Sequence, residues 1–152
     1  MARSIAWGER HGDRRLVATE HANLGDLAFQ TGDDREAGAQ YAAALDGFVK
    51  MGRLSELPFL LPGIAALAAR AGDDQTCATL LGASDAVAQT PAVQEPGDPA
   101  EIWMSTIREA EARSGPSFGQ WRRDDPALGT EQAISLAMDV ARRAATRDIP
   151  ER

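Results

Sequence analysis

The stretch from Gly115 to Gly119, GPSFG, has the G-x-S-x-G pattern that surrounds the nucleophile of many serine hydrolases. That chemistry needs a strand entering and a helix leaving a strained turn, and in that enzyme class the histidine follows the serine along the chain. Here a helix is expected before the turn, and both histidines, His11 and His21, precede Ser117. We interpret the stretch as a break between helices with Ser117 capping the second one, and keep a serine hydrolase only as an alternative.

The sequence predicts no catalytic residue, no metal site and no cofactor. His11 and His21 are ten residues apart and lie near no cysteine, so the ligand spacing of a metal site is missing. Cys77 is the only cysteine, which excludes a disulfide within the chain. It stands where a sister repeat has an alanine, and this favours a small packed residue over a reactive thiol.

Pairs of aspartates could serve acid–base or metal chemistry, but their positions favour a structural role. Gly32-Asp33-Asp34 returns forty residues later as Gly72-Asp73-Asp74. The glycine suits a left-handed residue that ends a helix, and an aspartate then caps the next helix. The same shift aligns other small or apolar positions: Leu24 with Ile64, Leu27 with Leu67, Ala28 with Ala68, Ala37 with Cys77.

This repetition predicts a single all-α domain over residues 1–152, built as a right-handed superhelix of antiparallel helix pairs with about seven helices. The repeat units span about 12–51 and 52–91, each with two helices joined by the Gly-Asp-Asp turn. Pro62 is expected to kink or restart the third helix. A different helical cap covers about 98–148, opening at Asp98-Pro99 and ending in a helix over about 130–146.

Charge and composition narrow the class of partner. The net charge is −7 and the pI is about 4.8, so a nucleic-acid backbone would be repelled and no direct nucleic-acid partner is expected. No apolar stretch is long enough for a transmembrane helix, and the first residues lack the apolar core of a signal peptide. The sequence therefore predicts a cytoplasmic protein that is not an enzyme.

The first unit resembles a tetratricopeptide repeat. The segment NLGDLAFQTGDDREAGAQYAAAL carries small and aromatic residues at the spacing of that motif: Leu24, Gly25, Ala28, Gly32, Ala37, Tyr41 and Ala44. It departs from the motif at His21, Ala28 and Val49, where the family often has tryptophan, tyrosine and proline. The forty-residue period also exceeds the usual length of that repeat.

From about Gly12 onward the chain resembles the C-terminal region of ATP-dependent regulators of the LuxR and MalT type. The resemblance rests on ATLLGASDAV at 78–87 and on the later pattern of Phe118, Trp121, Leu128 and 131–137. The ATP-binding loop of such regulators and a DNA-recognition helix are both missing here, so neither activity is carried over. What the resemblance implies is a non-catalytic region of a bacterial transcriptional regulator that receives a signal through a protein partner.

In repeats of this kind the first helix of each unit lines the concave side. The resemblance therefore implies that the first helices of the two units form a face for a protein or peptide partner. The residues of this face are Asn23, Asp26, Gln30, Phe59 and Arg70. An ordinary solvated helix face is an equal alternative, and a structural or dimerising segment without a ligand is another.

Residues 1–11 align with the second helix of an incomplete unit, which leaves an apolar stripe uncovered. The sequence therefore predicts a fragment or shortened relative of a longer regulator, with a possible homodimer through the N-terminal helix around Ile5 and Trp7.

Overall fold

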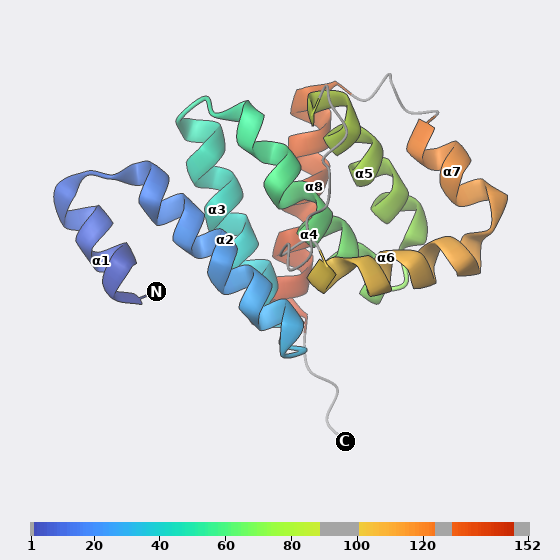
Figure 1. Cartoon of the computed structure of the whole chain (residues 1–152), viewed down its shortest axis with the longest axis horizontal. Coiled ribbons are helices and arrows are strands. Elements are labelled where there is room, and N and C mark those ends of the chain that lie inside the picture. The colour runs from blue at the N-terminus through green and yellow to red at the C-terminus, as the bar shows by residue number, and fades with distance from the viewer. Residues whose placement is uncertain (1, 89–100, 124–128, 148–152) are drawn as a thin grey trace.

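The computed structural model describes residues 2–88, 101–123 and 129–147, which form eight α-helices and one short 3-10 helix, with no strand among them (Figure 1). The elements are α1 (Ala2–His11), α2 (Arg14–Gln30), α3 (Asp34–Lys50), η1 (Leu54–Glu56), α4 (Leu57–Arg70), α5 (Asp74–Ala88), α6 (Glu101–Ser114), α7 (Pro116–Arg123) and α8 (Thr130–Thr146). The all-helical class is confirmed, with one α-helix more than the about seven predicted. No helix in the described ranges is both long and apolar enough to cross a membrane.

One type of corner ends the first four α-helices in turn. Each has a glycine with positive φ, which residues with a side chain rarely adopt. The next residue then donates its N–H to a carbonyl five residues back, as Asp33 does to Ala28 at 2.9 Å. The four glycines are spaced by twenty residues and have φ angles of 70°, 82°, 67° and 85°: Gly12, Gly32, Gly52 and Gly72. The forty-residue repeat thus contains the same corner twice.

Three of these corners continue into an aspartate that caps the next helix, as predicted for two of them. The Oδ1 atoms of Asp13, Asp33 and Asp73 accept backbone N–H bonds three residues on, at 3.0 to 3.1 Å. The third corner has Arg53 in that position, which cannot cap. There η1 comes first, and α4 begins only at Leu57 without a side-chain cap.

Helix α4 is the centre of the core. Ten of its 14 residues are buried, and it contacts α2, α3, α5, α6 and α8. It runs unbroken through Pro62, so the predicted restart of the helix there is wrong. A proline inside a helix costs about 3 kcal/mol, but burial of so many apolar side chains along the same helix outweighs that loss.

The other helices surround two hairpins, α2–α3 and α4–α5. Helix α8 packs on α3, α4 and α5, while α6 contacts α2, α4, α5 and α7 (Figure 1). Helix α7 covers α5 at one end of the array, and α1 contacts only α2 among the described elements. The predicted cap residues Asp98 and Pro99 lie outside the described residues.

Candidate protein-binding face

The five residues predicted to bind a partner divide into two groups in the structure. Asn23 and Gln30 are exposed on α2, and Phe59 on α4 is 75% exposed. Asp26 and Arg70 are instead held by contacts within the chain. Only the first group is free to meet a partner without rearrangement of the fold.

Asp26 belongs to a hydrogen-bonded chain that joins three helices. The hydroxyl of Tyr41 on α3 donates to Asp26 Oδ1 at 2.7 Å, and Trp103 Nε1 on α6 donates to the Tyr41 hydroxyl at 3.1 Å. Both aromatic side chains are almost fully buried. These bonds satisfy the polar atoms that the core encloses, and they attach α6 to the α2–α3 hairpin.

Two glycines make room for Tyr41. A Cβ atom on Gly25 would lie 2.5 Å from the Tyr41 ring, and one on Gly63 would lie 2.7 Å from its hydroxyl oxygen. Neither distance is compatible with a side chain, so the ring fills a slot between α2 and α4 that only glycine leaves open. Gly25 is part of the repeat motif, whereas nothing local in the sequence indicates the same role for Gly63.

Burial raises the pKa values of Asp26 and Tyr41 in this hydrogen-bonded chain. Loss of hydration raises the pKa of Asp26 to about 6, even though the bond from Tyr41 favours the charged carboxylate. Burial and the nearby Asp26 carboxyl raise the pKa of Tyr41, so its hydroxyl remains a donor. We assign the three residues to positioning α6, since the bonds between them join α6 to α2 and α3.

Arg70 connects the two Gly-Asp-Asp corners. Its guanidinium stacks on the Phe29 ring at 3.6 Å, donates from Nη2 to the Phe29 carbonyl at 2.9 Å, and pairs through Nη1 with Asp34. In the second corner Asp74 receives two bonds from Arg113 of α6, at 2.9 and 3.1 Å. The second aspartate of each triplet therefore binds an arginine from a later helix, a role beyond the capping that the sequence predicted.

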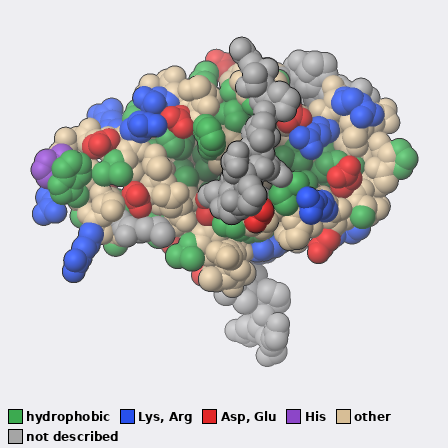
Figure 2. Space-filling view, in the orientation of Figure 1, with side chains coloured by type: hydrophobic (Ala, Val, Ile, Leu, Met, Phe, Trp, Pro, Cys, Tyr) green, Lys and Arg blue, Asp and Glu red, His purple; other side chains and the backbone are tan. Residues whose placement is uncertain are grey.

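An exposed leucine completes the accessible part of the predicted face. Leu27 is 48% exposed and lies on the same stripe of α2 as Asn23 and Gln30, at the i, i+4, i+7 spacing of one helix side. We call Asn23, Leu27, Gln30 and Phe59 the α2–α4 face. In Figure 2 hydrophobic side chains reach the surface among charged ones on the side of the molecule that shows α2 and α4.

Charged side chains border Phe59. Glu56, three residues earlier, lies 3.6 Å from the guanidinium of Arg15 and 3.3 Å from that of Arg53. Leu54, in the same corner, is 40% exposed. Two arginines against one glutamate make this surface locally positive, although the chain as a whole carries a net charge of −7.

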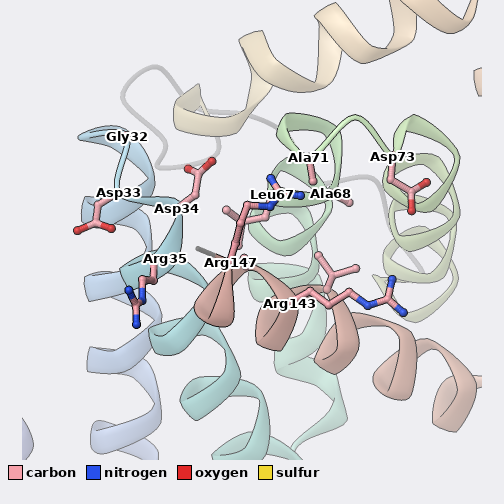
Figure 3. A pocket seen from close by; sticks show the side chains of 12 residues that line it. Gly32, Asp33, Asp34, Arg35, Leu67, Ala68, Ala71, Asp73, Arg143 and Arg147 are labelled. Atoms are coloured by element: carbon pink, nitrogen blue, oxygen red, sulfur yellow. The ribbon is translucent and has the colours of Figure 1, made fainter. Parts of the chain in front are cut away.

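A hollow of about 490 Å³ lies where the two Gly-Asp-Asp corners approach the C-terminal end of α8 (Figure 3). Its carboxylates are engaged: Asp33 and Asp73 cap helices, and Asp34 pairs with Arg70. Three arginines also line it and form no ion pair with any described residue: Arg35, Arg143 and Arg147. The hollow has the charge to hold a small anion, but no buried polar group points into it.

The two residues predicted for self-association lie on α1. Trp7 is 47% exposed and stacks on His11, with 4.1 Å between the ring centroids. Ile5 is half-buried. Because α1 contacts α2 alone among the described elements, most of its surface has no helix against it.

The two histidines and the cysteine have ordinary surroundings. His11 Nδ1 lies 2.8 Å from the Trp7 carbonyl, and His21 Nδ1 lies 2.7 Å from Gln40 Oε1. Cys77 is fully buried, and burial raises the pKa of its thiol to about 12. Within the described ranges no group of three or more His, Cys, Asp or Glu side chains could hold a metal ion.

Ser117 does not stand on a nucleophile turn. It is the second residue of α7, and the chain enters from α6 through Gly115, whose φ is 59°. The strand that a nucleophile elbow requires is replaced by a helix at this position. The predicted break between helices is confirmed, but the predicted capping role of Ser117 is wrong, because Ser117 lies inside α7 and not before it.

Comparisons with known protein families, curated proteins and solved structures found no match to this chain.

Proposed function

We propose that this chain is a non-catalytic interaction module that receives a protein partner on the α2–α4 face. In this proposal the two hairpins are units of a right-handed superhelix of the tetratricopeptide type, and the face lies on its concave side. The wider role, signal reception within a bacterial transcriptional regulator, rests on the resemblance of the repeat and of the C-terminal segment.

The exposure of Phe59 is the observation that carries the proposal. It is 75% exposed on a helix whose other large side chains are almost all buried. Leaving a phenylalanine in water forgoes about 2 kcal/mol of burial free energy, and exposed aromatic side chains are frequent anchors in protein interfaces. Leu27, exposed on the adjacent helix α2, extends the apolar surface available to a partner.

The surroundings of Phe59 indicate the chemistry of the partner. Arg15 and Arg53 both lie beside the single carboxylate of Glu56, so this part of the face has an excess of positive charge. A segment with an aromatic or aliphatic anchor flanked by acidic residues matches both properties. Asn23 and Gln30 add amide groups that can bond to the partner backbone.

The proposal is tested by selecting peptides from a displayed library against the full chain, then measuring their affinity for variants. We expect anchors flanked by Asp or Glu, and about a tenfold or greater loss of affinity for Phe59→Ser and Leu27→Ser. Ala39→Ser is the matched control, because Ala39 is exposed on α3, outside the face, and the change introduces the same side chain. Peptides that bind both face variants as tightly as the wild type would overturn the proposal.

Asp26 and Arg70 are unsuitable for such a test, because changing either one also breaks internal bonds. The regulator role has its own test, which is whether the reading frame upstream of Met1 encodes an ATP-binding module. No observation at Ser117 favours the serine-hydrolase alternative, and it is not proposed.

A further inference from the structure

A helix already occupies one groove of this array. Helix α8 lies against α3, α4 and α5, with α4 between the other two (Figure 1). Small residues allow this close approach: a Cβ atom on Gly38 of α3 would lie 2.5 Å from the Ala141 carbonyl oxygen and 2.8 Å from Ala144 Cβ. The groove formed by three consecutive helices of the repeat therefore accepts a fourth helix.

The forty-residue shift places a second groove of the same kind one unit earlier, between α1 and α3 and over α2. The shift carries α1, α2 and α3 onto positions in α3, α4 and α5, with Ile5 falling on Leu45. This second groove has a volume of about 690 Å³ and draws lining residues from all three helices. Five of its eleven lining residues are again small: Gly8, Gly12, Ala18, Ala43 and Gly47. No helix of the described ranges lies in it.

We propose that helix α1 of a second copy of this chain fills this groove in a two-fold dimer, so that each copy covers the groove of the other. Ile5 lies on the stripe of α1 that includes the groove-lining Gly8 and Glu9, at helical spacing. Trp7 points to the opposite side of the helix. The incoming α1 lies between α1 and α3 of the other copy. Its Ile5 and Trp7 side chains, on opposite sides of the helix, are then both covered.

The groove carries charges of both signs, with Glu9 and Asp46 beside Arg14 and Lys50, so α1 of a second copy can form ion pairs there. Arg3 and Arg10 are exposed on α1, and Glu9 and Asp46 are carboxylates on the groove walls. Asp46 already pairs with Lys50 at 2.9 Å, so an incoming arginine would extend an existing ion pair. A two-fold arrangement places the same arginines and carboxylates on both copies, and each contact is made twice.

The other end of the array explains why association should stop at two copies. Helix α7 covers α5 so closely that a Cβ atom on Gly82 would lie 2.2 Å from the Arg122 carbonyl oxygen. With that end covered, the α1 end of one copy cannot continue onto the α5 end of another. Pairing of like ends then gives a closed dimer and not a filament.

Sedimentation equilibrium of the full chain between about 1 and 100 µM tests this proposal. We expect a dimer whose dissociation constant rises about tenfold or more in Trp7→Ser, which removes an aromatic anchor, and in Ala43→Lys, which places a long positive side chain in the groove where the arginines of α1 would lie. Phe59→Ser should leave the dimer unchanged, because Phe59 lies outside the groove. Thermal unfolding followed by circular dichroism shows that each variant remains folded.

A wild-type chain that is monomeric at the highest concentration overturns the proposal. So does a dimer that keeps its wild-type dissociation constant in both groove variants. Ala43 lies on α3, away from α1, so its variant remains informative even if Trp7→Ser unfolds α1. The test is independent of the α2–α4 face: loss of dimerisation with peptide binding intact separates the two proposals.

Discussion

Replacing Asp26 with asparagine should stabilise this protein at neutral pH. The Asp26 carboxyl accepts a bond from the Tyr41 hydroxyl at 2.7 Å, and the amide oxygen of asparagine can accept the same bond. Burial raises the pKa of Asp26 from 3.8 to about 6, so holding its charged form in the folded protein carries a cost that asparagine does not have.

The size of the effect follows from the pKa. A rise from 3.8 to about 6 corresponds to at most about 3 kcal/mol at high pH. Asp26 is only partly buried, and screening by water reduces this to about 1 to 2 kcal/mol. Because the pKa is higher in the folded state, the contribution of Asp26 to stability is complete below pH 3.8 and is lost as the pH rises through 6.

The assay is urea unfolding of dilute wild type and Asp26→Asn at several pH values from about 4 to 7.5, followed by circular dichroism. The free energy of unfolding of the variant should exceed that of the wild type by an amount that grows across this range. Asp46→Asn is the control, since Asp46 is exposed and its difference from the wild type should vary by less than about 0.5 kcal/mol. A variant less stable than the wild type at pH 7.5 would refute the reasoning, because the carboxylate would then be net favourable.

Three further predictions concern packing, capping and reactivity. Gly63→Ala should lower the free energy of unfolding by about 1 to 3 kcal/mol, because the added Cβ lies 2.7 Å from the enclosed Tyr41 hydroxyl. Gly119→Ala, whose Cβ would meet only an arginine side chain at 3.2 Å, should instead raise it by up to about 1 kcal/mol. Asp33→Ala should cost about 1 kcal/mol in the same urea assay, with most of the loss recovered in Asp33→Asn. Cys77 should react with a thiol reagent only as the protein unfolds, since it is fully buried and its pKa is raised to about 12; rapid labelling of the folded protein in an absorbance assay would contradict this.

Local chemistry made the helices and their corners predictable. A glycine that ends a helix and an aspartate that caps the next one act within a few residues, so Gly32-Asp33 and Gly72-Asp73 are recognisable in the sequence. The helix predicted over about 130–146 also coincides with α8, Thr130–Thr146. A restart of the helix at Pro62 is wrong, because the local cost of a proline does not take account of the burial along the rest of the helix.

The candidate face was only partly predictable. Helical spacing correctly placed Asn23, Gln30 and Phe59 on exposed surface, because periodicity reports which side of a helix points outward. It could not show that Asp26 meets Tyr41, fifteen residues away, or that Arg70 reaches back to Asp34, thirty-six residues away. Leu27 aligns with the buried Leu67 as a repeat position, and its spacing of four residues from Asn23 is the signal in the sequence that places it on the face.

The amino-acid sequence by itself determined that this chain forms helices, where most of them end, and that one type of corner recurs along it. Those properties depend on interactions between residues close together in the chain. Only the tertiary structure decided that α6 is attached through Trp103 and Tyr41 to Asp26, that α8 fills one groove, and that a similar groove lies beside α1. These features depend on which helix faces meet, and that is set by the fit of side chains distant in sequence and by the space that glycines such as Gly38 and Gly63 leave open.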